Sequence, residues 1–150
     1  MPHQWIVSKA LLDMDRQELS FRIASTGLEL WKQETDETYN CYEHFMIANG
    51  RGAGFHQFSG LSSPVMKWFE SYYIPGTITC GFQTKILKAD WNETHTELTL
   101  DIEVFTEKAS VIVCMNSAKK YLIPDAAKVT EGAYVFSLSS GVHTINIQSI

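Results

Sequence analysis

A chain of 150 residues is long enough for one domain, or for two small lobes that share a core, and needs no disulfide bonds to fold. Its composition, 45% hydrophobic and 19% charged, is that of an ordinary globular protein. The formal net charge of −5 offers no basic surface, which argues against nucleic acid, anionic polysaccharide and anionic membrane as partners.

The first half of the chain has the periodicity of helices. A short helix is expected over residues 4–14, and a second helix follows Asp15, whose carboxylate is suited to cap it. Apolar residues of the second helix recur at helical intervals and form one face: Phe21, Ala24, Leu28 and Trp31. Gly27 destabilises this helix by about 1 kcal/mol relative to alanine, and close packing against another helix would account for it.

A third helix is predicted from Ser63, with that residue as N-cap and Pro64 at the first helical position. Its apolar residues again keep helical spacing: Val65, Trp68, Phe69 and Tyr72. Pro75 and Gly76 end it. The large apolar faces of these helices either cover a face of a sheet or belong to a larger helical array.

From Thr77 onward the period changes to two. Apolar and polar residues alternate without a break over 96–104, which is typical of a half-buried antiparallel strand. Further strands are expected at 77–90, 110–116, 133–138 and 142–148, with turns at Asn92-Glu93, Glu131-Gly132 and Ser140-Gly141. The sequence therefore predicts an α+β protein, with a helical segment over residues 1–75 packed on an antiparallel, sandwich-like β lobe over 76–150.

The cysteines and the N-terminus point to a reducing compartment. Cys41, Cys80 and Cys114 fit neither a disulfide framework nor a zinc motif, so buried free thiols are expected. No apolar run reaches the ~18 residues of a membrane span. The first residues lack a basic segment before an apolar stretch, so they do not form a signal peptide. We therefore expect a cytoplasmic protein with no membrane partner, and a signal on a longer parent chain would lie outside this sequence.

Residues 41–60, CYEHFMIANGRGAGFHQFSG, carry the candidate site between the second and third helices. Their glycines lack the following lysine of a phosphate-binding loop, which argues against a nucleotide cofactor. His44 and His56 follow no metal-ligand spacing, and nothing places a base beside Cys41 for nucleophilic catalysis. No cofactor or metal is therefore expected, which leaves acid–base chemistry by Glu43 or a purely structural loop.

The order of residues in this region resembles the end of the (α/α)6 barrel of inverting glycoside hydrolases, the family 63 glucosidases and the family 37 trehalases. The matching elements follow in order: Tyr42-Glu43-His44-Phe45, the glycine-rich segment 49–54, His56-Gln57-Phe58-Ser59-Gly60, and the helix opened by Ser63-Pro64. Upstream, Trp5 and the helix over 15–34 resemble the preceding barrel helices. The resemblance covers residues 3–74, and Gly60 stands where a tryptophan is usual.

The resemblance implies that Glu43 is the general base, which deprotonates the water that attacks the anomeric carbon of an α-glucoside-type oligosaccharide. It also implies substrate contacts from the surrounding side chains: Tyr42, Phe45, Arg51, His56, Gln57 and Phe58. The general acid of such enzymes lies on an earlier barrel segment, so this chain is expected to be a C-terminal fragment or subunit that is inactive alone. Its partners would be carbohydrate and either the missing N-terminal part of the enzyme or a second copy of the chain.

An alternative is a non-catalytic carbohydrate-binding or oligomerisation module, in which the β lobe carries recognition and the helices mediate association. In that lobe Trp91 and Tyr134 are candidate sugar platforms, although such aromatic residues more often pack in a core. The charged run from Glu29 to Glu37 is interpreted as a solvated helix end.

Overall fold

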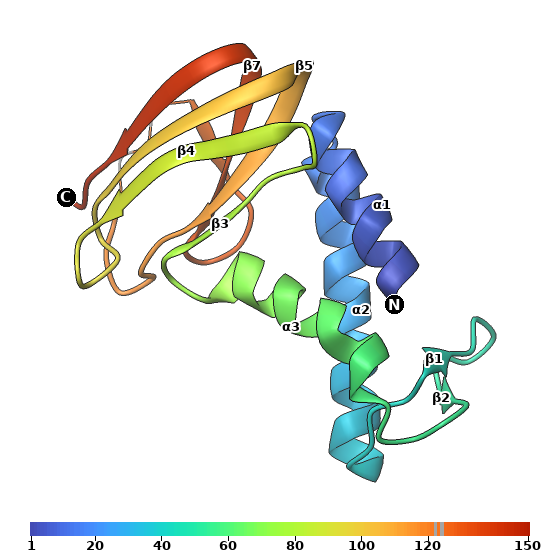
Figure 1. Ribbon diagram of the computed structural model, residues 1–150. Coiled ribbons are helices and arrows are strands. Elements are labelled where there is room, and N and C mark those ends of the chain that lie inside the picture. The colour runs from blue at the N-terminus through green and yellow to red at the C-terminus, as the bar shows by residue number, and fades with distance from the viewer. Residues whose placement is uncertain (122, 124) are drawn as a thin grey trace.

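In the residues that the computed structural model describes, 1–121, 123 and 125–150, three helices are followed by a curled antiparallel sheet (Figure 1). The helices are α1 (Pro2–Asp13), α2 (Gln17–Thr38) and α3 (Ser59–Tyr73). The sheet contains β3 (Thr77–Thr79), β4 (Thr84–Trp91), β5 (Leu98–Cys114), β6 (Ala126–Lys128) and β7 (Ala133–Ile147), and a separate small hairpin of β1 (His44–Phe45) and β2 (Gly52–Ala53) lies between α2 and α3. The side chains of Ser59 and Leu61 are outside the description. The predicted α+β class is confirmed.

Helix α2 buries a stripe that contains small side chains, which lets a neighbouring helix approach closely. Its buried residues keep helical spacing: Ser20, Ala24, Gly27 and Glu34. At Gly27 the Trp68 ring from α3 lies so close that an added Cβ would stand 2.6 Å from the ring atom Cζ3. The prediction that Gly27 serves close helix packing is therefore confirmed.

The expectation that Ser63 caps the third helix is wrong, because α3 already begins at Ser59 and Pro64 lies inside it. A proline has no N–H to donate to the carbonyl four residues earlier, which here belongs to Gly60. The Ser63 hydroxyl donates to that carbonyl instead, at 3.0 Å. Ser63 thus compensates for the proline within the helix. The helix ends at Tyr73, before Pro75 and Gly76 as predicted.

The expectation that Asp15 caps α2 is also wrong, because this residue clamps the α1–α2 turn to the sheet. Its φ is 54°, and its Oδ1 accepts a hydrogen bond from Ser110 Oγ at 2.8 Å. Its Oδ2 accepts from Ser137 Oγ at 2.6 Å and from Lys108 Nζ at 2.9 Å. Burial alone would raise the pKa of Asp15, but the hydrogen bonds from Ser137, Lys108 and Ser110 and the charge of Lys108 together lower that pKa.

The second half of α1 is joined to the β3–β4 connection. The carboxylate of Asp13 accepts hydrogen bonds from the amides of Phe82 at 2.8 Å and Gln83 at 2.9 Å. Lys9 donates to the Cys80 carbonyl, and its ammonium lies 5.9 Å from the centre of the Phe82 ring. Together with the Asp15 clamp, these contacts attach α1 and the turn after it to the β3–β4 connection and to the sheet.

The sheet has the order β3-β5-β7-β6, and β4 pairs with the first half of β5 on the same edge as β3. The strands predicted at 96–104 and 110–116 are halves of the single long strand β5, and those at 133–138 and 142–148 are halves of β7. The register is irregular between Val104 and Lys108, opposite Ser139 to Gly141. Ser140-Gly141 therefore marks a strand irregularity and not the turn that we expect from the sequence, and β6 has no counterpart in the prediction.

This irregularity reverses which side chains face the interior of the curled sheet. Before it, Leu98, Leu100 and Ile102 of β5 belong to the inner core, and after it Val111 and Val113 do. The alternate residues near the strand ends then face the helices, where they form a second core with α1, α2 and α3: Ile112, Ala133 and Val135 of the sheet with Leu12, Ala24, Val65, Trp68 and Tyr72. The helices therefore cover a sheet face, which is the first of the two arrangements expected for them.

The cysteines are free thiols, as expected, and none forms a disulfide in the part of the chain that is described. Cys114 is buried, and burial raises the pKa of its thiol to about 11. Cys41 and Cys80 are only half-buried, so the expectation that the thiols are buried holds for Cys114 and is wrong for the other two.

Gly27→Ala should destabilise the protein, because the new methyl group would overlap the Trp68 ring, which is itself only 3% exposed. We expect an overpacking loss of about 1–3 kcal/mol, reduced by about 1 kcal/mol of gained helix propensity. Urea denaturation measures the difference. The matched control is Gly60→Ala in α3, where the nearest heavy atom lies 4.0 Å from the added Cβ, so this variant should be neutral or slightly stabilised. Equal stability of Gly27→Ala and the wild type would contradict the close contact.

The Asp15 clamp should make stability depend on pH in a defined direction. Because its folded pKa is lowered, the clamp contributes fully above the unfolded value of about 3.9 and is lost as the pH falls through the lower folded pKa. Asp15→Asn should therefore be clearly less stable than the wild type at neutral pH and approach it in acid, as measured by urea midpoints. Asp36→Asn, in an exposed pair with Lys32, should change stability little at either pH. A deficit of Asp15→Asn that stays constant down to the acid limit would argue against the clamp.

Candidate functional site

The candidate site is the loop of residues 39–58, which extends from the end of α2 beside the N-terminal end of α3 (Figure 1). The hairpin pairs His44 with Ala53 and Phe45 with Gly52. Its base is closed by a hydrogen bond from the Glu43 amide to the Phe55 carbonyl at 3.0 Å. The loop is therefore a paired structure of its own and not a simple turn between two helices.

Glu43 is half-buried in this loop, and its carboxylate folds back over the second strand of the hairpin. Its Oε2 accepts a hydrogen bond from the Phe55 amide at 3.4 Å. Gly54 makes this position possible: its φ is +80°, and an added Cβ would stand 2.6 Å from the same Oε2. The loop backbone thus orients the carboxylate predicted to act as a general base.

A buried acid that we do not expect from the sequence anchors the loop to α2. Glu34 is 3% exposed, and its two carboxylate oxygens accept from Arg51 Nη2 at 3.0 Å and from the Gly52 amide at 2.8 Å. Arg51 also forms an ion pair with Glu37 at 2.5 Å. The guanidinium predicted to contact substrate is thus engaged with two acids of α2. The interpretation of the run Glu29–Glu37 as solvated is wrong for Glu34.

The helical spacing of residues in α2 indicates that Glu34 is buried, whereas the charged composition of the run 29–37 suggests that it is exposed. Glu34 follows Gly27 by two helical turns, on the stripe that also contains Ala24. A charged residue on a buried stripe needs a partner, and the arginine of the glycine-rich segment is such a partner. Periodicity therefore predicts that Glu34 is buried, but the sequence does not show which cation pairs with its carboxylate.

A cleft of about 940 Å³ lies between α1, α2 and the hairpin. Its floor is mainly apolar: Leu11, Leu19, Ile23, Leu30 and Trp68. Polar side chains also line it, and they are Gln4, Arg22, Thr26, His44 and Asn49. Glu43 is not among the described lining residues and neither is any other acid, but the next two residues, His44 and Phe45, both are. Among the predicted substrate contacts, Phe45 is thus the one that reaches the cleft.

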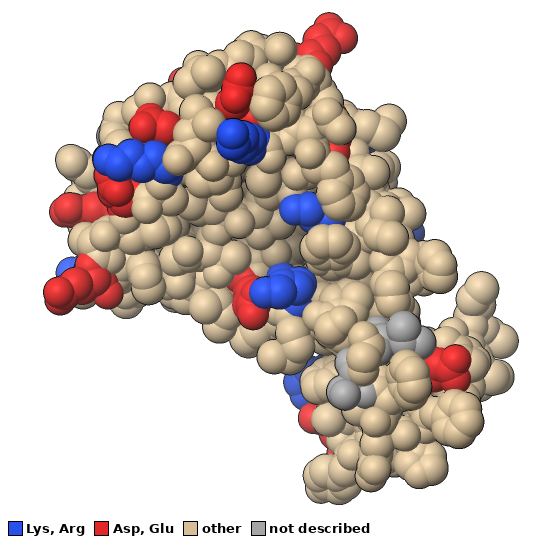
Figure 2. Space-filling view, in the orientation of Figure 1, with Lys and Arg blue, Asp and Glu red and all other residues tan. Residues whose placement is uncertain are grey.

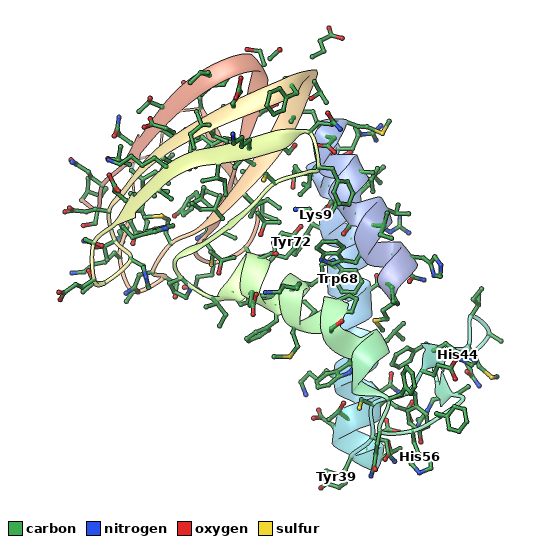
Figure 3. The ribbon with its side chains drawn as sticks, viewed as in Figure 1. Lys9, Tyr39, His44, His56, Trp68 and Tyr72 are labelled. Carbon is green, nitrogen blue, oxygen red and sulfur yellow. The ribbon has the colours of Figure 1, made fainter. Side chains whose placement is uncertain are left out.

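The remaining predicted contacts do not converge on the cleft. Tyr42 packs under the hairpin, where a Cβ on Gly52 would stand 2.2 Å from its ring. His56, Gln57 and Phe58 are exposed. Figure 3 shows His44 on β1, whereas His56 lies lower in the view, at the level of the end of α2. The exposed rings of Phe55 and Phe58 are thus not among the described residues that line the cleft.

The charges of the molecule are distributed unevenly on the face seen in Figure 2, where charged side chains are more numerous over the sheet than over the helices and the loop. Within the described residues, no group of three or more His, Cys, Asp or Glu side chains could hold a metal ion. Of the helices described, none is long and apolar enough to cross a membrane.

In comparisons with known proteins, no protein-family pattern, no curated protein and no solved structure matches the chain.

The anchor predicts that removing the Glu34 charge loosens the loop. In Glu34→Gln the charge-assisted bonds to Arg51 and Gly52 are lost or weakened, at about 1–3 kcal/mol, so the Arg51–Gly52 peptide bond should become accessible to trypsin. We expect cleavage there to accelerate several-fold, as followed by mass spectrometry. The matched control is Glu37→Gln, whose carboxylate is 48% exposed and should matter less. Equal cleavage rates in the wild type and Glu34→Gln would show that the buried acid does not hold the loop.

Proposed function

We propose that this chain supplies the general-base half of a glycoside hydrolase site, with Glu43 as the base, acting on α-glucoside-type oligosaccharides with inversion. The observation that carries the proposal is the position of the Glu43 carboxylate, which accepts a hydrogen bond from the Phe55 amide at the base of the anchored hairpin. The two residues that follow Glu43, His44 and Phe45, line the cleft. The resemblance of residues 3–74 to the end of an (α/α)6 barrel is a second, independent support, because it assigns the same role to Glu43.

The chemistry assigned to Glu43 is abstraction of a proton from water. With Oε2 oriented by the Phe55 amide, we assign Oε1 to the attacking water. As the water oxygen bonds to the anomeric carbon, its proton passes to Glu43, and the bond to the leaving group breaks on the opposite face of the sugar. The half-buried position suits this task, because the carboxylate stays accessible to water while its orientation is fixed.

Hydrolysis of an ordinary glycoside also requires a proton donor about 6.5–9.5 Å from the base. The described lining of the cleft contains no acid, and the nearby acid Glu34 has both oxygens occupied by Arg51 and Gly52. We therefore assign the donor to another polypeptide segment. Large apolar side chains on the helices support such a neighbour, since Ile6 and Val7 of α1 and Met66 and Phe69 of α3 are each about half exposed.

A second candidate function is carbohydrate binding or assembly without catalysis. It is favoured by one observation, namely that the Glu43 side chain is not among the described residues that line the cleft. In that case the cleft would bind ligand through Arg22, His44 and Asn49, and a change at Glu43 would leave binding unaltered.

The base can be tested apart from the acid with α-glucosyl fluoride, because fluoride leaves without prior protonation. The wild-type chain should hydrolyse this substrate with inversion, giving β-glucose as the first product, whereas maltose should remain intact. Glu43→Gln should lower the rate by about 10²–10⁴-fold, the usual contribution of a positioned general base. Fluoride release and the anomer observed by NMR are the measurements.

The matched control is Glu29→Gln, an exposed acid on α2, which should hydrolyse the fluoride at the wild-type rate. Equal fluoride release by the wild type and Glu43→Gln would exclude Glu43 as the base. Hydrolysis of maltose by the chain alone would contradict the assignment of the donor to another segment.

A further inference from the structure

A second, smaller cleft lies on the sheet, at the ends of β4, β5 and β7 and far in sequence from the Glu43 loop. Its volume is about 260 Å³, and we call it the strand-end cleft. Three neighbouring strands contribute to it in register, since Thr99 of β5 pairs with Asp90 of β4 on one side and with Asn146 of β7 on the other. Because directly paired residues share a face of the sheet, these three side chains form one row.

The next residues on the same face extend this polar row. Side chains alternate between the faces of a strand, so Glu97 stands two residues before Thr99 and Gln148 two residues after Asn146 on the same side. Both line the strand-end cleft. This row therefore combines two carboxylates, two amides and one hydroxyl, which together can accept and donate several hydrogen bonds to one small molecule.

The β4–β5 turn and the Trp91 side chain, which border the cleft, are held in place by contacts within the protein. Asn92 closes the β4–β5 turn, because its Oδ1 accepts from the amides of Thr96 at 2.8 Å and Glu97 at 3.1 Å. Trp91 packs on the inner core of the sheet, and its ring meets that of His95 edge-on at 5.5 Å. Trp91 therefore serves mainly as a packed support, and Tyr134, the other predicted sugar platform, packs beside Tyr121.

Charge decides what kind of ligand fits. The described lining contains Asp90 and Glu97 and neither lysine nor arginine, but the ammonium of Lys88, outside the lining, forms an ion pair with Asp90. Repulsion of an anion therefore comes mainly from Glu97. A metal cation would need converging oxygen atoms. The side-chain oxygen of Asn146 accepts from the Thr99 hydroxyl at 3.0 Å, which leaves its NH₂ group and the second lone pair of that oxygen available to a ligand. An NH₂ group repels a cation but donates well to a hydroxyl oxygen.

We propose that the strand-end cleft binds a neutral, hydroxyl-rich ligand, namely one sugar ring of an oligosaccharide. Carboxylates accept strong hydrogen bonds from sugar hydroxyls, and the amides supply donors and acceptors for the neighbouring hydroxyls. The volume is slightly below the lower end of the range for drug-sized ligands, which suits a single ring. This site is independent of Glu43, so it extends the proposed function without depending on it.

The test is a titration of the ¹⁵N-labelled full chain followed by amide chemical shifts, with maltose, glucuronate and Ca²⁺ as separate probes. Maltose should shift the amides of residues 97–99 and 146–148 with a dissociation constant in the millimolar range, which is typical of a few exposed hydrogen bonds. Glucuronate should bind several-fold more weakly because its carboxylate would meet the carboxylate of Glu97. Ca²⁺ should leave these amides unchanged.

Two variants make the outcome specific. Asn146→Ala should weaken maltose binding by up to about tenfold, since it removes a donor at an exposed position where the fold is not at risk. Glu43→Gln should bind maltose at the strand-end cleft as the wild type does, so failure of the base assignment and failure of this site are distinguishable. Shifts with Ca²⁺ but not with maltose would identify a cation site and overturn the proposal. Maltose shifts that are absent, or that persist unchanged in Asn146→Ala, would overturn it as well.

Discussion

The buried carboxylate of Glu34 is the interaction on which the candidate site depends. It lies on the packed stripe of α2, and both of its oxygens are used by the loop, one by Arg51 and one by the Gly52 amide. A carboxylate removed from water is stable only with such partners. Detachment of the loop from α2 would leave the Glu34 carboxylate buried and unpaired, and this cost keeps the loop in contact with the helix. Glu43 immediately precedes β1 of the same hairpin, so we infer that the position of its carboxylate depends on this anchor.

The anchor can work only because α2 is itself held in place. Gly27 lets α2 approach the Trp68 ring of α3, and Asp15 joins the turn before α2 to Ser110 and Ser137 on the sheet. The side chains of the long strands change faces at the irregularity between Val104 and Lys108. As a result the sheet contributes apolar side chains both to its inner core and to the core that it shares with the helices. A local break in one strand pair thus allows one sheet to build its own inner core and to support a helical layer on the other side.

Much of this architecture can be predicted from the sequence, because periodicity reports directly on burial. The helical stripe around Ala24 and the packing role of Gly27 follow from spacing alone, and so does the α+β class. Cap positions cannot be predicted in the same way. Asp15 is a good capping residue in isolation, but tertiary hydrogen bonds to the sheet compete for its carboxylate. Ser63 before Pro64 has the pattern of a helix start, yet the same pair is stable inside a helix when the hydroxyl replaces the missing N–H donor.

The candidate site was predictable only in part, for a related reason. The sequence indicates Glu43 and the glycines that let the backbone turn, and the φ of +80° at Gly54 agrees with that interpretation. It does not indicate the direction of side chains in the loop, which depends on distant partners. The sequence suggests that Arg51 contacts a ligand, but its guanidinium forms ion pairs with Glu34 and Glu37. The strand-end cleft is invisible in sequence, because its row of Asp90, Thr99 and Asn146 exists only through strand register.

Hydrogen exchange at the Gly52 amide tests most directly whether α2 holds the loop as a fixed platform for Glu43. This amide donates to Glu34 Oε2 at 2.8 Å, at the point where the hairpin meets the helix. If the platform is fixed, the amide should exchange orders of magnitude more slowly than in an unstructured peptide, with protection close to that of amides in the middle of α2. Exchange at the rate of an unfolded chain would mean that the loop is free, and that no defined position of the Glu43 carboxylate exists for catalysis.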